Sequence, residues 1–178
     1  QDNLITENWV DYSPEKSIEK IQSIGFKKNK SGYFEDSNGN EIYITIGIVS
    51  GWADWIRAGQ IISKNLDDIG IRSRVKTQDF GAWFNDLQTG EFSAAISWAE
   101  SGPTPYPMYE GLMASKNIKP IGEPSGTNWH RFGLDEIDSL VSIFEISSDE
   151  ETKERLVDRM QELFIETAPA IPLFADPT

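Results

Sequence analysis

The stretch IYITIGIV at residues 42–49 decides the fold, together with IRSRVKT at residues 71–77. In the first stretch isoleucine occupies every second position, which is the period of a strand with one buried face. In the second, apolar and small polar residues alternate with charged ones. Residues 54–69 between them place apolar side chains at helical spacing, and Gly70 ends that helix. Strand, helix and strand in this order predict a parallel βαβ unit.

Further elements are predicted on both sides of this unit. Residues 94–98 are small and apolar and predict a third strand of the same sheet. Asn38-Gly39 predicts a hairpin turn that leads into the first long strand. The other predicted elements are helices at 14–24, 80–87, 135–146 and 150–167, the last with a capping box at Ser148 and Glu151, a helical turn at 106–114, and an extended segment at 169–174.

Composition indicates one compact domain and excludes several partners. The chain has 178 residues, of which 38% are hydrophobic, enough for one buried core. Its formal net charge of −13 would repel phosphate backbones and anionic lipids, so we expect neither nucleic acid nor a membrane surface as a partner. The absence of cysteine excludes thiolate catalysis, thiolate zinc sites and disulfides.

The chain ends suggest a piece of a longer protein. Gln1 is followed by Asp2 and Asn3 rather than by a basic and then apolar signal peptide, and no run approaches the roughly 20 apolar residues of a membrane span. We therefore expect any export signal to lie outside residues 1–178.

Signatures of catalysis, metals and cofactors are missing. His130 is the only histidine, and without a second histidine or a cysteine it cannot form a conventional zinc site. Asp36, Asn38 and Asn40 imitate the start of a calcium loop, but the sharp-turn position carries Glu41 instead of glycine. No glycine-rich phosphate loop and no Gly-x-Ser-x-Gly elbow occurs. We predict no catalytic residue, no metal and no cofactor.

Tryptophans are the most informative candidate residues. Trp55 fits the apolar stripe of the predicted helix at 54–69, and we expect both Trp55 and Trp83 in the core, because large aromatic side chains dominate burial energetics. Trp52 and Trp98 instead follow predicted strands, at the edge of a parallel sheet where α/β proteins bind ligands. Flat indole faces suit the C–H-rich face of a sugar ring, while neighbouring amides and carboxylates can bind its hydroxyls.

Four motifs in series resemble family 5 extracellular solute-binding proteins, the peptide, nickel and oligosaccharide receptors of ABC importers. The motifs are YSPEK at 12–16 leading to Gly25-Phe26, LDDIGI at 66–71, GEFSAA at 90–95 leading to Trp98, and APAIPLF at 168–174. The resemblance covers nearly the whole chain in the right order.

The resemblance implies a fold, a location and partners. Residues 1–178 would form a single α/β lobe of the periplasmic-binding-protein type, with a mixed, mostly parallel sheet flanked by helices. This would be the carboxy-terminal lobe of a receptor whose two lobes close on a small-molecule ligand by hinge motion. The receptor would be extracytoplasmic, either periplasmic or lipid-anchored, and monomeric, and it would deliver its ligand to an ABC permease in the membrane.

The loop after Trp98 bears on the ligand class. Peptide-binding members usually carry an aspartate three residues after the corresponding tryptophan, and here that position is Ser101. Residues 98–106 and 126–131 are instead similar to loops of receptors for cello- and other β-linked oligosaccharides. The predicted ligand-binding residues are Trp52, Trp98, Glu100, Ser101, Tyr106, Asn128, Trp129 and Arg131.

Two alternatives stay open. An oligopeptide receptor would use Glu100 or Asp54 to bind the ligand's cation. A carbohydrate-active enzyme would need a pair of carboxylates, for which the same two residues are candidates.

Overall fold

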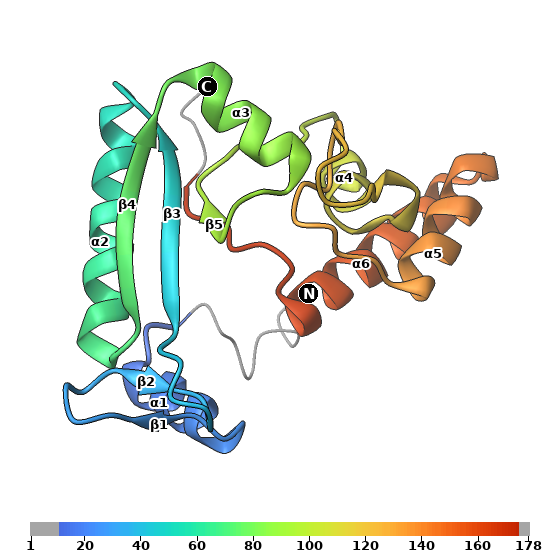
Figure 1. Cartoon of the computed structure of the whole chain (residues 1–178). Coiled ribbons are helices and arrows are strands. Elements are labelled where there is room, and N and C mark those ends of the chain that lie inside the picture. The colour runs from blue at the N-terminus through green and yellow to red at the C-terminus, as the bar shows by residue number, and fades with distance from the viewer. Residues whose placement is uncertain (1–10, 175–178) are drawn as a thin grey trace. The chain divides into compact units, whose positions relative to one another are not determined.

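The computed structural model describes residues 11–174, which divide into two compact units (Figure 1). Residues 11–87 and 91–97 form one, here called the sheet unit. Residues 88–90 and 98–174 belong to the other, here called the helical unit. Each unit is described by itself.

A three-stranded parallel sheet forms the centre of the sheet unit, with strand order β4-β3-β5 (Figure 1). β3 (Tyr43–Val49) pairs with β4 (Arg72–Gln78) on one side and with β5 (Ala94–Ala95) on the other. Helix α2 (Ala53–Ile69) connects β3 to β4 and ends at Gly70, whose φ of 95° is the left-handed conformation of a C-cap. The predicted βαβ unit is confirmed.

Alternation along β3 places helices on both faces of the sheet. Ile46 and Ile48 are buried under α2, where Gly59 permits close approach, because a Cβ at that position would collide with Ile48 Cδ1. Gly47 points to the other face, where Trp83 of α3 (Phe80–Thr89) lies 3.8 Å from an ideal Cβ built on it. The predicted α/β architecture, with a sheet flanked by helices, is confirmed.

A small antiparallel layer precedes the main sheet. Helix α1 (Pro14–Ser23) is followed by β1 (Lys27–Lys28), which pairs with β2 (Phe34–Glu35). The sequence did not predict β1, because two exposed lysines carry no strand signal. The predicted hairpin turn forms, since the N–H of Asp36 donates to the Asn40 carbonyl at 2.9 Å, but only an isolated bridge joins Glu35 to Glu41.

Helices make up the helical unit. They are α4 (Tyr106–Met113), the short 3₁₀ helix η1 (Ser115–Asn117), α5 (Asp135–Ile146) and α6 (Glu150–Thr167). Their buried side chains include Met113, Ile137 and Met160, each fully inaccessible to solvent. The predicted bounds of α5 and α6 are confirmed. Within residues 11–174, no helix is both long and apolar enough to cross a membrane.

Two sequence predictions need correction. β5 ends at Ala95 rather than Trp98, because burial stops at Ile96 and the following residues are exposed. Helix α6 is capped by Asp149 rather than Ser148: the Asp149 carboxylate accepts from the Thr152 N–H at 2.9 Å.

The corrected cap predicts a difference between neighbouring substitutions. We expect Asp149→Ala to lower the free energy of unfolding by about 1 kcal/mol, the usual cost of losing an N-cap acceptor. Ser148→Ala, one residue earlier, should change it by less than about 0.5 kcal/mol. Urea denaturation of both variants measures the difference, and equal losses would show that Asp149 is not the cap.

Candidate functional site

Trp98 and Trp129 meet edge to face in the helical unit. Their ring centroids lie 5.6 Å apart with an interplanar angle of 89°. Trp129 is half-buried, and its Nε1 donates to the Ser125 carbonyl at 3.1 Å. Trp98 remains 40% exposed. The pair therefore combines an anchored indole with one that offers area to a ligand.

Glu100 and Ser101 follow Trp98 on the same exposed loop. The Glu100 side chain lies against α4 at Gly111, where an added Cβ would come within 3.1 Å of Glu100 Cγ and 3.9 Å of Thr127 Cβ. The loop that carries Glu100 is thus adjacent to the one that carries Trp129. Among residues 11–174, no cationic side chain is within ion-pair distance of the Glu100 carboxylate. That carboxylate is therefore available to ligand hydroxyls or amines.

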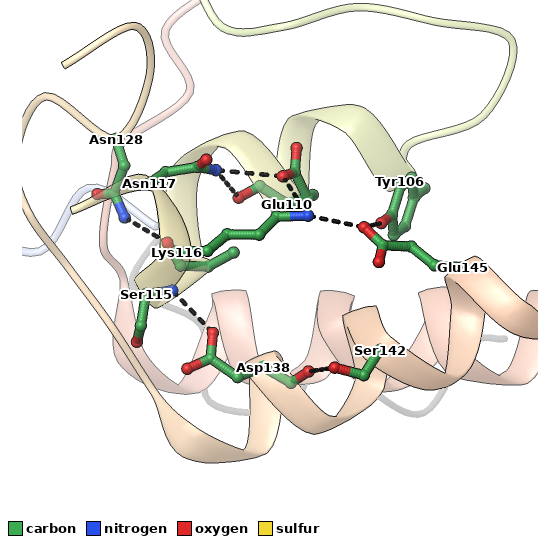
Figure 2. Close-up of polar contacts among 10 residues, drawn as sticks. Tyr106, Glu110, Ser115, Lys116, Asn117, Asn128, Asp138, Ser142 and Glu145 are labelled. Atoms are coloured by element: carbon green, nitrogen blue, oxygen red, sulfur yellow. Dashed lines mark hydrogen bonds and ion pairs between the residues drawn. The ribbon is translucent and has the colours of Figure 1, made fainter.

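Tyr106 stacks inside the helical unit. Its ring is parallel to that of Phe144, with centroids 3.8 Å apart. Its hydroxyl donates to Glu145 at 3.5 Å (Figure 2). Burial and the nearby Glu145 charge raise the pKa of Tyr106. These contacts tie the start of α4 to α5.

Lys116 extends this network between two carboxylates (Figure 2). Its Nζ lies 2.7 Å from Glu145 and 3.1 Å from Glu110. The hydrogen bond from Lys116 lowers the pKa of Glu145, and the same contact raises the pKa of Lys116. Asn117 also donates to Glu110, at 3.2 Å. Sequence reasoning missed this cluster, because its members come from separate elements.

The side chains of Asn128 and Arg131 form hydrogen bonds with the backbone of the helical unit. Asn128 is only 2% exposed, and its amide donates to the carbonyls of Ala114 and Phe132 while accepting from the Phe132 N–H. The Arg131 guanidinium donates to backbone carbonyls from several segments. These contacts position the loop around Trp129.

Trp52 lies in the sheet unit, within a cluster of aromatic rings. Its centroid is 4.6 Å from that of Trp55, 6.0 Å from that of Trp83 and 6.2 Å from that of Phe80. Trp83 is fully buried, as expected, whereas Trp52 is 37% and Phe80 48% exposed. The cluster follows the carboxyl ends of β3 and β4, which is the edge predicted for ligand contact.

Phe80 was missed in the sequence, although a signal existed. It begins the helix after β4, as Trp52 precedes the helix after β3. Carboxyl ends of adjacent parallel strands lie at the same edge of a sheet, so Trp52 and Phe80 are expected to lie close together. Phe84 stacks on Phe80 with centroids 5.5 Å apart and extends the cluster.

The sheet unit also contains a cavity of about 380 Å³ on the face opposite α2. Arg74, Lys76, Asp86 and Glu91 are its charged lining residues. Asp86 accepts from the Gln78 amide at 2.8 Å and pairs with Lys76 at 3.5 Å. The lining therefore carries charges of both signs, part of them already paired within the unit.

Metal-binding groups are not assembled in the part of the chain that is described. Residues 11–174 contain no cluster of three or more histidine, cysteine, aspartate or glutamate side chains able to hold an ion. Burial lowers the pKa of His130, and the neighbouring Arg131 charge lowers it as well. The Asp36 carboxylate accepts from the N–H groups of Asn38 and Asn40 and from the Asn40 amide.

Sequence comparison matches a known family over most of the chain. The family described as "Bacterial extracellular solute-binding proteins, family 5 Middle" matches residues 1–120. A comparison with curated protein sequences found no match.

Solved structures with similar folds come from several bacteria. The mannohexaose-bound periplasmic oligopeptide-binding protein of a *Thermotoga maritima* ABC transporter is 26% identical, with a TM-score of 0.85 over 95% of this chain and 32% of that one. AppA of *Bacillus subtilis*, in complex with a nonapeptide, is 20% identical, with a TM-score of 0.77 over 89% of this chain and 31% of its own. MelB of *Agrobacterium fabrum*, in complex with stachyose, is 16% identical, with a TM-score of 0.73 over 89% and 25%. The chain thus spans about a third or less of the length of these proteins.

Proposed function

Because this chain belongs to the family 5 bacterial extracellular solute-binding proteins, we propose that it captures an oligosaccharide for an ABC importer. The observation that carries the proposal is the Trp98–Trp129 pair, in which a partly exposed indole is supported edge to face by an anchored one. A sugar ring can stack on such a surface. The exposed Glu100 carboxylate, two residues after Trp98, can accept hydrogen bonds from the hydroxyl groups of the sugar.

Three observations favour an oligosaccharide over a peptide. Ser101 stands where peptide-binding members usually carry their anchoring aspartate. Partly exposed aromatic rings also occur in the sheet unit, considered by itself, at Trp52 and Phe80. The *Thermotoga maritima* protein that is 26% identical to this chain was solved with mannohexaose bound. We propose β-linked oligosaccharides of the cello-oligosaccharide type, which the similarity of residues 98–106 and 126–131 to loops of such receptors supports.

The whole receptor would be longer than this chain. The chain matches only 32% of the length of the Thermotoga maritima protein. From the resemblance of its motifs to family 5 receptors, we propose that residues 1–178 form the carboxy-terminal lobe. The receptor would act outside the cytoplasm as a monomer, close on its ligand and present it to a membrane permease. Family members and structural neighbours are binding proteins rather than enzymes.

An oligopeptide ligand is the second candidate, favoured by one observation. Glu100 is an exposed carboxylate without a cationic partner among residues 11–174. It could neutralise a peptide's amino terminus from a position one residue before Ser101.

Isothermal titration of the full-length receptor separates the two candidates. Cellohexaose, mannohexaose and a short peptide would be titrated in parallel into the ligand-free protein. Saturable binding of a hexaose without peptide binding supports the proposal. Binding of the peptide alone would contradict the oligosaccharide proposal and support an oligopeptide ligand.

Glu100→Gln tests both the role of this carboxylate and the absence of turnover. We expect the affinity for the oligosaccharide to fall about three-fold, because the amide keeps a hydrogen-bonding group but loses the charge. The control is Glu154→Gln, an exposed substitution on α6 that should leave affinity unchanged. Chromatography of a long incubation with the wild type should recover intact sugar. Cleavage by the wild type that Glu100→Gln abolishes would identify an enzyme instead.

A further inference from the structure

We propose that Arg131 is a positioning residue, which clamps the loop at residues 119–132 and thereby fixes the orientation of Trp129. This inference rests on the proposed function, because Trp129 matters only if the Trp98–Trp129 pair contacts the ligand. It assigns Arg131 a role different from the direct ligand contact that the sequence suggested.

The Arg131 guanidinium joins three stretches of backbone. Its Nε donates to the Lys119 carbonyl at 3.1 Å, and its Nη2 donates to those of Gln88 and Glu123 at 2.8 and 3.1 Å. Its Nη1 donates to the carbonyl of Trp129 itself. A guanidinium has five N–H donors in a rigid fork, so most of its hydrogen-bonding capacity is used inside the protein. Little of it remains for a ligand.

Gly90 provides the space for this clamp. A Cβ built on Gly90 would lie 2.5 Å from Arg131 Cζ and Nη1. Any other residue at position 90 would therefore displace the guanidinium. The φ of Gly90 is +75°, which also favours glycine. Backbone bonds reinforce the junction, because Gly122 N–H donates to the Thr89 carbonyl at 2.8 Å and Ser125 N–H to that of Gln88 at 2.9 Å.

Backbone conformation shows that the clamped loop is held under constraint. Asn128 and Arg131, which bracket Trp129, have φ values of 48° and 56° although neither is glycine. Such conformations are sparsely populated and persist where surrounding contacts enforce them. The buried Asn128 amide supplies contacts on one side of Trp129, and Arg131 supplies them on the other.

The consequence is a preorganised indole. Trp129 is fixed by its neighbours' backbone and by its own Nε1 bond to Ser125, and it supports Trp98 edge to face. A side chain that is ordered before the ligand arrives does not have to lose that freedom on binding, so affinity rises without a new contact.

A double-mutant cycle in the full-length receptor separates positioning from direct contact. We expect Arg131→Lys to weaken oligosaccharide binding about four-fold, because a lysine ammonium cannot reproduce the planar fork. In a Trp129→Ala background the same change should have no effect on affinity. An equal loss in both backgrounds would overturn the proposal. Arg155→Lys is the matched control, since Arg155 is exposed on α6 and should leave affinity unchanged.

Fluorine NMR of fluorotryptophan-labelled protein tests the clamp without any ligand. Arg131→Lys should shift or broaden the resonances of Trp129 and Trp98 and leave that of Trp83, in the sheet unit, unchanged. Gly90→Ala, which displaces the guanidinium from its other side, should produce the same pattern. Unchanged Trp129 and Trp98 resonances in both variants would refute the clamp. Because this readout needs no ligand, a wrong ligand class and a wrong role for Arg131 give different results.

Discussion

Trp83→Ala is expected to lower the free energy of unfolding of the sheet unit by about 3–5 kcal/mol, the range for removing a buried large aromatic side chain. Only 1% of Trp83 is exposed, and its indole lies against Gly47 in the central strand β3. Trp52, Trp55 and Phe80 surround it with ring centroids 5.9–6.2 Å away. These bulky neighbours cannot all move inward, so the substitution leaves a cavity.

Trp52→Ala is the matched control for this loss. It removes the same side chain from the same cluster, but from a position that is 37% exposed. We therefore expect a smaller cost, about 1–2 kcal/mol. Urea denaturation followed by fluorescence, together with hydrogen exchange of the β3 amides, measures both variants. Equal costs for the two substitutions would show that Trp83 does not support the sheet as its burial indicates.

Much of the fold could be predicted because its signals are periodic. Alternating isoleucines at residues 42–49 and the helical stripe at 54–69 each reflect one buried face, and those faces meet in the structure as β3 and α2. The end of α2 at Gly70 was also predictable, because a left-handed C-cap strongly favours glycine. The short strand β1 has no comparable signal, since its two lysines are exposed and its pairing depends on β2.

The candidate site was predictable only in part. Trp98 and Trp129 could be identified as ligand candidates because they lie in or beside predicted loops, but their mutual contact depends on the path of two loops. From the sequence alone, the polar side chains of Asn128 and Arg131 could bind either a sugar or the protein's own backbone. Their partners are backbone carbonyls, which every residue has, so no pattern in the sequence distinguishes a loop anchor from a ligand contact.

Trp98→Ala in the full-length receptor is expected to lower the affinity for the oligosaccharide ten-fold or more, the largest effect on binding that we predict. Stacking on one indole contributes on the order of 1 kcal/mol, by analogy with aromatic pairs. The substitution also removes apolar area that the ligand would cover, and it leaves Trp129 without its edge-to-face partner. A ten-fold loss corresponds to about 1.4 kcal/mol, which these effects together reach.

Two further variants determine whether the flat ring itself is responsible. Trp98→Phe keeps an aromatic face of smaller area, so it should recover part of the affinity that Trp98→Ala loses. Tyr12→Ala removes an aromatic side chain that is 73% exposed in the sheet unit, outside the aromatic cluster, and should leave affinity unchanged. Isothermal titration with the same hexaose measures all three. If Trp98→Ala binds as tightly as the wild type, Trp98 is not a sugar platform, and the proposed ligand class loses the observation that carries it.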